Sequence, residues 1–180
     1  GVVGKDGPTH QGIYDLAMLQ LMPNIKIMMG KDAAEAKGLL EYGLKTKGPI
    51  ALRYPKLKTV EMDKTVILDE KWEIVLEGSK GYLISYGPDV VRLCRLVKEN
   101  NLDLTVINAR FIRPIDNKML DMIGGSNKPI LIYEQVVESS SLAMMISYYF
   151  TKQKYNSGLI HNMAFNNNQI ITHGDISEVL

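Results

Sequence analysis

The fold of this chain is decided by residues 25–53, which read IKIMMGKDAAEAKGLLEYGLKTKGPIALR. Two short apolar runs, at 25–29 and 50–53, have the composition of buried strands. Between them, Asp32 is placed to cap a helix that ends near Lys47, before a Gly-Pro pair. A strand, a helix and a second strand in this order predict parallel pairing through a right-handed crossover. We expect the inward side of the helix to carry Ala36, Leu39, Leu40, Gly43 and Leu44.

The same alternation of strands and helices continues through the rest of the chain. Residues 56–71 alternate charges with isolated apolar residues, as a connector between domains does, and a new unit begins near Trp72. The helix at 89–100 is expected to leave Arg92 in water. The other expected elements are helices at 14–22, 116–123 and 142–150 and strands at 82–85, 104–108, 129–133 and 159–164.

This pattern predicts an α/β protein with two open sheets and flanking helices. Residues 1–56 are expected to form the first domain, 57–71 a linker, and 72–180 the second domain. The chain opens on GVVG (1–4), where Val2 and Val3 read as the end of a strand. A chain that opens in this way is expected to start inside a domain, so we interpret it as a fragment.

Composition and charge limit the classes of function. A net charge of +1 over 180 residues, with no dense Lys/Arg cluster, argues against nucleic-acid binding. No apolar run approaches the ~20 residues of a membrane span. The single cysteine, Cys94, excludes an internal disulfide and fits a reducing cytoplasm. Its place in an amphipathic pattern favours a small core residue over a nucleophile.

The densest group of chemically useful residues is the stretch GKDGPTHQG at 4–12. Glycine and proline at this density exclude a regular helix or a central strand, so the stretch is a loop. Loops that hold a carboxylate and an imidazole, here Asp6 and His10, are frequent places for sites. An Asx-type turn with an exposed histidine explains the same residues, and the residue types alone leave both interpretations open.

Arg53 is the third candidate site residue. If Val2 and Val3 end a strand, the loop at 4–12 and Arg53 share the carboxyl edge of one sheet, where open α/β sheets bind ligands. A guanidinium there can present parallel donors to a phosphate, and the alternative is a salt bridge to a neighbouring carboxylate. These side chains predict a pocket for a small phosphorylated, hydroxylated substrate.

The remaining titratable residues have structural interpretations. His161 lies within an apolar run and is expected to be a core or edge histidine, whereas His173 is placed to cap a terminal helix. Glu134 ends a predicted strand and is interpreted as an interface or structural carboxylate. The histidines and the cysteine lie too far apart for metal-ligand spacing, and neither G-x-x-x-x-G-K-[ST] nor G-x-G-x-x-G occurs.

The motifs DGPTHQG (6–12), MPN (22–24) and GPIALRYP (48–55) together resemble the pyrimidine-binding domain of the transketolase superfamily. Within it they look most like the 1-deoxy-D-xylulose-5-phosphate synthase family. Gly12 stands where transketolases proper usually have proline, and LRYP (52–55) stands where they have a Ser-Arg-Gln sequence.

The second half of the chain also resembles this family, and its motifs occur in the family's order. Its motifs are LISYG (83–87), VINARFIRPID (106–116), YEQVV (133–137) and THG (172–174). One departure is ESSS at 138–141, where relatives usually have a glycine-rich turn. The resemblance therefore covers the whole chain.

This resemblance implies an enzyme that uses thiamine diphosphate and Mg²⁺ to condense pyruvate with glyceraldehyde 3-phosphate, releasing carbon dioxide. The product serves isoprenoid, thiamine and pyridoxal synthesis. The resemblance implies that His10 exchanges protons with substrate oxygens, that Asp6 orients this network, and that Arg53 holds the aldehyde's phosphate. It also implies a homodimer.

The family's cofactor-activating glutamate and stacking aromatic residue are expected before residue 1, and the Gly-Asp-Gly magnesium motif is absent from this sequence. We therefore expect no cofactor or metal bound by these residues alone, and no turnover. Two other interpretations stay open, namely one half of a split transketolase-like enzyme and a non-catalytic interaction module with this fold.

Overall fold

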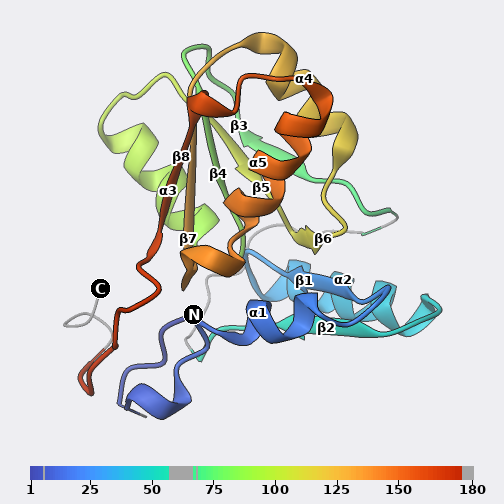
Figure 1. Cartoon of the computed structure of the whole chain (residues 1–180), viewed down its shortest axis with the longest axis vertical. Coiled ribbons are helices and arrows are strands. Elements are labelled where there is room, and N and C mark those ends of the chain that lie inside the picture. The colour runs from blue at the N-terminus through green and yellow to red at the C-terminus, as the bar shows by residue number, and fades with distance from the viewer. Residues whose placement is uncertain (6, 57–66, 68, 176–180) are drawn as a thin grey trace.

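The computed structural model describes residues 1–5, 7–56, 67 and 69–175. Its helices and strands are arranged around two sheets, one below the other in Figure 1. The expected α/β class with two open sheets and flanking helices is confirmed. In chain order the elements are η1 (Pro8–His10), α1 (Asp15–Gln20), β1 (Lys26–Met29), α2 (Ala33–Lys45), β2 (Ile50–Arg53), β3 (Glu73–Leu76), β4 (Tyr82–Ser85), α3 (Asp89–Glu99), β5 (Thr105–Asn108), β6 (Phe111–Arg113), α4 (Asn117–Ser126), β7 (Ile130–Val137), η2 (Glu138–Ser140), α5 (Leu142–Gln153), η3 (Ser157–Leu159) and β8 (Ile160–Phe165).

The first sheet contains the strand–helix–strand unit that the sequence predicts. Strands β1 and β2 pair in parallel, with Lys26 opposite Ile50 and Met29 opposite Arg53. The Asp32 side chain caps α2 by accepting a hydrogen bond from the Glu35 backbone nitrogen at 2.8 Å. The predicted cap and the parallel pairing are therefore confirmed.

Two local expectations in this half are wrong. Val2 and Val3 form no strand, because their backbone nitrogens donate to side-chain oxygens of Gln135 and Gln11 instead of to a neighbouring strand. On α2, Leu40 and Leu44 are 47% and 78% exposed. The buried face instead follows the i, i+4, i+8 row Glu35, Leu39 and Gly43, which is narrower than the predicted stripe.

The first sheet is completed by a strand from the second half of the chain. Its order is β2-β1-β6, and β6 pairs antiparallel with β1 through Ile27–Arg113 and Met28–Phe111. In Figure 1, β6 is the edge strand of the first sheet and lies on the side that faces the second sheet. The sequence analysis missed this three-residue strand, so the two halves are more closely joined than expected.

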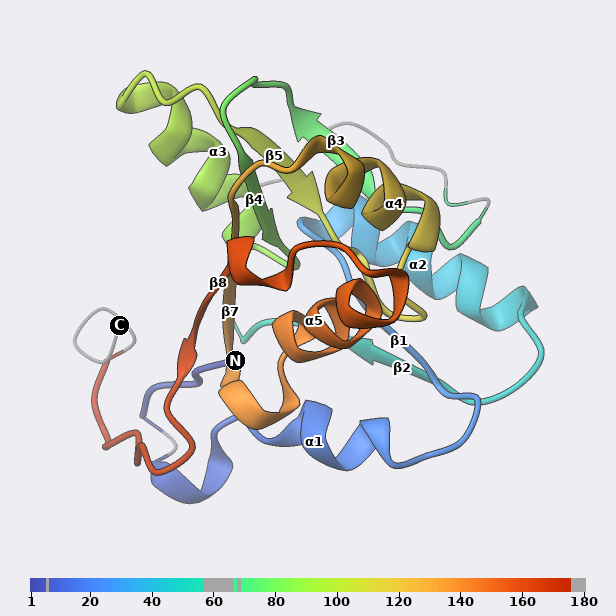
Figure 2. The ribbon, with the colours of Figure 1, turned by 45° about the horizontal axis from the view of Figure 1, so that its top comes forward.

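The second sheet has the order β3-β5-β4-β7-β8. Strand β4 pairs in parallel with β5 on one side and with β7 on the other, and β3 adds an antiparallel edge that the sequence analysis missed. Helix α3 covers one face of this sheet and α5 the opposite face (Figure 2).

Burial on the second sheet alternates as expected for a sheet covered on both faces. Leu83 of β4 packs in a cluster with Val90 and Val97 of α3, whereas the next residue, Ile84, packs with Ile146 of α5 and its neighbours. No helix in the described ranges is long and apolar enough to cross a membrane.

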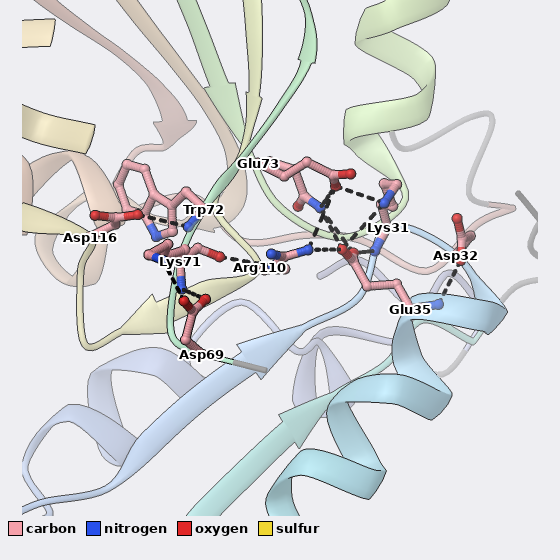
Figure 3. Close-up of polar contacts among 10 residues, drawn as sticks. Lys31, Asp32, Glu35, Asp69, Lys71, Trp72, Glu73, Arg110 and Asp116 are labelled. Carbon is pink, nitrogen blue, oxygen red and sulfur yellow. Dashed lines mark hydrogen bonds and ion pairs between the residues drawn. The ribbon is translucent and has the colours of Figure 1, made fainter. Parts of the chain in front are cut away.

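A buried polar group joins the two sheets, and we call it the junction cluster; its members are Lys31, Glu35, Glu73, Asn108 and Arg110. The Glu35 carboxylate, with no exposed surface, accepts hydrogen bonds from Lys31 N at 2.7 Å, from Asn108 Nδ2 at 2.9 Å and from Arg110 Nη1 at 3.3 Å. Glu73 accepts from Lys31 Nζ at 2.8 Å. Figure 3 shows Lys31, Glu35, Glu73 and Arg110 pointing toward one another.

The junction cluster predicts acid-sensitive stability. Burial would raise the pKa of Glu73, but the hydrogen bond and charge of Lys31 outweigh it and hold this pKa below its ordinary value. Ionised Glu73 therefore stabilises the fold above its unfolded pKa, and this contribution is lost as the pH falls through the folded pKa. Because the carboxylate is partly exposed, Glu73→Gln is expected to lower the free energy of unfolding by only ~1 kcal/mol at neutral pH.

Urea unfolding of the wild type and the variant measures this difference, which should vanish at acidic pH. The control is Glu77→Gln, which changes an exposed carboxylate just beyond the same strand. A stability difference for Glu73→Gln that persists unchanged when the carboxylate is protonated would contradict the assignment.

Candidate active site

A cavity of about 350 Å³ lies between the two halves of the chain. This volume lies in the range of small-molecule sites. The cavity is at the carboxyl end of β2 and, across from it, the carboxyl end of β4. Its wall includes the polar side chains of Asp15 and Arg53 from the first half and of Asp89, Arg92 and Gln135 from the second.

Arg53, the predicted phosphate-binding residue, lies in the wall of this cavity with 8% of its surface exposed. Its Nε and Nη2 donate to the two carboxylate oxygens of Asp15 at 2.6 and 3.0 Å, and Nη2 also donates to the Gly12 carbonyl at 3.1 Å. The salt bridge that the sequence left open as an alternative is therefore formed. Nη1 donates to Met29 Sδ at 3.6 Å, a weak acceptor, so this edge keeps capacity for a stronger one.

Tyr86 of the second half contacts Arg53, and Glu134 in turn contacts Tyr86. The Arg53 guanidinium carbon lies 5.5 Å from the centre of the Tyr86 ring. The Tyr86 hydroxyl donates to Glu134 Oε2 at 3.0 Å. Glu134 also accepts the backbone N–H groups of Leu142 and Ala143, at 2.8 and 3.1 Å, in the first turn of α5.

Burial is the main cause of the shifted pKa values of Glu134 and Tyr86. Burial raises the pKa of Glu134, although the N–H groups of α5 act in the opposite direction. Burial and the neighbouring Glu134 carboxylate raise the pKa of Tyr86, so its hydroxyl keeps its proton and acts as a donor. Glu134 is thus a structural carboxylate, one of the two alternatives that the sequence left open, although it lies inside β7 and not at its end.

His10 lies outside the cavity wall. It ends η1, it is exposed, and its Nδ1 lies 2.9 Å from Thr9 Oγ1 in a hydrogen bond. The loop around it is closed by Gln11, which accepts from Val3 N at 2.8 Å and donates to the Gly7 carbonyl at 3.0 Å. Asp6 lies outside the described residues. The structure therefore brings Arg53 to the cavity wall and leaves the imidazole of His10 outside it.

The other residues that the sequence singled out lie away from the cavity. His161 is exposed on β8, the last strand of its sheet, which fits the predicted edge histidine. His173 is exposed, and the helix expected after it falls outside the described residues. Cys94 is half-buried on α3 against the apolar cluster there. Across the described positions, no group of three or more His, Cys, Asp or Glu side chains is placed to hold a metal ion.

Sequence reasoning missed several residues of the cavity wall. Asp15 follows the loop at 4–12 in the chain, but its pairing with Arg53 has no local signature. Arg92 was expected to face water, and its side chain is indeed 52% exposed, yet it lines the cavity. Tyr86, Asp89 and Gln135 come together through the order of the strands, which no short motif encodes.

Two family matches together cover most of the chain. Residues 1–60 match the pyrimidine-binding domain of transketolase, and residues 70–179 match the transketolase C-terminal domain. The chain therefore belongs to the transketolase family.

Among curated proteins, the chain is similar to 1-deoxy-D-xylulose-5-phosphate synthases. The protein from Lysinibacillus sphaericus is 33% identical over 188 residues, and that from Carboxydothermus hydrogenoformans is 32% identical over 186 residues. Both alignments cover all of this chain and 30% of the relative. The synthase of Exiguobacterium sibiricum is 38% identical over 76% of this chain and 23% of its own length. The chain thus spans about 30% of the length of its first curated relatives.

A solved structure titled "Split gene transketolase, inactive beta4 tetramer" shares the fold. The TM-score is 0.78 at 16% sequence identity, and the match covers 89% of this chain and 54% of the other. At this identity the likeness concerns the fold alone.

The support of Arg53 by the second half predicts a measurable stability effect. Tyr86→Phe removes the hydroxyl that donates to the buried Glu134, so Oε2 of this carboxylate loses one of its two donors and keeps the Leu142 N–H group. We expect the free energy of unfolding to fall by about 1–3 kcal/mol. Urea denaturation measures it, with Tyr82→Phe as the control because the described residues offer its hydroxyl no carboxylate. Equal, small effects of both substitutions would contradict the role of the Tyr86–Glu134 contact.

Proposed function

We propose that this chain is part of a 1-deoxy-D-xylulose-5-phosphate synthase, an enzyme that condenses pyruvate with glyceraldehyde 3-phosphate. The observation that carries the proposal is the alignment of the entire chain with such synthases at 33% identity. Arg53 in the wall of a cavity supports it, because that residue type in that place suits a phosphorylated substrate. The whole protein's activity as a transferase is part of the proposal.

In this proposal, Arg53 binds the phosphate of the aldehyde. Asp15 fixes the plane of the guanidinium through two hydrogen bonds, so little side-chain freedom is lost when a ligand binds. The Nη1 edge, which meets the weak acceptor Met29 Sδ, is the one that donates to phosphate oxygens. A triose phosphate is small enough for a cavity of about 350 Å³.

His10 is proposed to exchange protons with the hydroxyl and carbonyl oxygens of the substrate. An imidazole suits this task because it titrates near neutral pH. Its Nδ1 is engaged by Thr9, which leaves Nε2 for the substrate. Asp6, outside the described residues, is proposed to orient the same network.

Thiamine diphosphate with Mg²⁺ supplies the carbon–carbon bond chemistry in this family. The residues of this chain do not fit the diphosphate–magnesium end of that group. The sequence has no Gly-Asp-Gly, and the described residues hold no carboxylate or imidazole cluster suited to a metal. We propose that residues outside this chain hold the cofactor.

We also propose a homodimer that acts in the cytoplasm. Around α1, Met18, Leu21 and Met22 are 62%, 85% and 48% exposed, which is an apolar surface of the kind that a second copy covers. The similar solved transketolase is itself titled a tetramer. The single cysteine fits a reducing compartment.

The phosphate role of Arg53 predicts a selective kinetic defect. In the whole enzyme, Arg53→Ala should raise the KM for glyceraldehyde 3-phosphate roughly 10- to 100-fold, because a charge-assisted contact worth about 1.5–3 kcal/mol is lost. The KM for pyruvate should change far less. Steady-state kinetics with each substrate varied in turn measures both, after circular dichroism has shown that the variant is folded. Equal effects on the two substrates would refute the phosphate assignment.

The misfit with the cofactor predicts that this chain alone does not bind it. Isothermal titration of the 180-residue chain with thiamine diphosphate and MgCl₂ should show no micromolar binding. The whole enzyme is the positive control. Micromolar binding by the chain would show that its own residues form the cofactor site.

A further inference from the structure

The wall of the cavity opposite Arg53 carries a second arginine that the proposed function does not use. Arg92 of α3 donates through Nη1 to Asp89 Oδ1 at 3.2 Å. The Asp89 carboxylate, 8% exposed, also accepts hydrogen bonds from Gln135 Nε2 at 3.1 and 2.9 Å. Arg92 is therefore held at the cavity by a carboxylate that Gln135 already fixes.

The place of this arginine in the fold is one where ligands are expected. The chain leaves β4 to form β5 on one side and later returns to form β7 on the other side of β4. In an open α/β sheet, such a reversal opens a crevice at the carboxyl ends of the strands. Asp89 and Arg92, which follow β4, and Gln135 of β7 lie at this point and line the cavity.

We propose that Arg92 is a second phosphate-binding residue, so that the cavity holds a short phosphorylated hydroxy-carbonyl compound between Arg53 of the first half and Arg92 of the second. This inference rests on the proposed function and adds to it a residue of the C-terminal domain. The phosphate then determines specificity through both halves of the chain.

The charges of the wall agree with this arrangement. Among the residues that the structure describes, Arg53 pairs with the carboxylate of Asp15 and Arg92 with that of Asp89. Arg92 engages Asp89 through Nη1, which leaves Nε and Nη2 for the parallel pair of hydrogen bonds that a guanidinium makes with a phosphate. The two carboxylates of the same wall are acceptors for hydroxyl groups of the ligand.

The test titrates the 180-residue chain with inorganic phosphate, glyceraldehyde 3-phosphate and unphosphorylated glyceraldehyde. Binding is followed through the arginine Nε–H signals in nitrogen-15 NMR spectra. Arg92→Gln is compared with Arg53→Gln and with Arg95→Gln, whose side chain is exposed on the same helix and outside the cavity. Circular dichroism checks folding, and Arg92→Lys tests whether charge alone restores binding.

We expect Arg92→Gln to raise the Kd for both phosphorylated probes about tenfold, and Arg95→Gln to leave it unchanged. If Arg53→Gln weakens binding and Arg92→Gln behaves like Arg95→Gln, the inference on Arg92 is overturned while the proposed function stands. If neither arginine matters, or the wild-type chain binds neither phosphorylated probe, the two-arginine site is overturned. The kinetics of Arg53→Ala in the whole enzyme then decide the proposed function separately.

Discussion

The rest of the structure depends on the compensation of one buried charge, the carboxylate of Glu35. A buried carboxylate without partners costs several kcal/mol, so its donors have to be in place when the chain is folded. Those donors come from both halves, since Lys31 follows β1 whereas Asn108 and Arg110 come from the end of β5 and the residues after it. The same segment then forms β6 and pairs with β1. Satisfying Glu35 therefore fixes the first sheet against the second.

The junction also positions the cavity, because strand β1, which contacts the junction, pairs with β2, whose end carries Arg53. Met29 N donates to the Arg110 carbonyl at 3.0 Å, and Met29 is the register partner of Arg53 on β2. Across the cavity, Glu134 repeats the same principle, with a buried carboxylate satisfied by the first turn of α5 and by Tyr86. Glu35 and Glu134 are thus both buried carboxylates whose hydrogen-bond partners come from separate elements. They stabilise the segments on the two sides of the cavity, which suits a site that is formed before its ligand binds.

How much of this the sequence predicts depends on the range of the interactions. The strand–helix–strand unit was predicted correctly because its signals are local: apolar runs, the Asp32 cap and a Gly-Pro stop. Strand β6 was missed because three residues carry no periodicity, and its pairing with β1 joins residues far apart in the chain. On α2, Leu39 and Gly43 were placed correctly on the buried face, whereas Leu40 and Leu44 were not, because apolar spacing cannot show that a charged residue, Glu35, is buried with its partners. Arg53 was found from its place at a strand end, but its partner Asp15 was not.

The pairing of Arg53 with Asp15 also explains how a loop outside the cavity is tied to it. Asp15 and Gly12 hold the guanidinium; Gly12 is the last residue of the loop that carries His10, and Asp15 follows it. Gln11 closes that loop onto Gly7 and Val3, and Val2 next to it donates to Gln135 of the cavity wall. The segment that carries His10 is therefore joined by hydrogen bonds both to Arg53, through Gly12 and Asp15, and to Gln135 of the cavity wall, through Val2. These contacts fix where the segment leaves the cavity, although the imidazole itself does not line it.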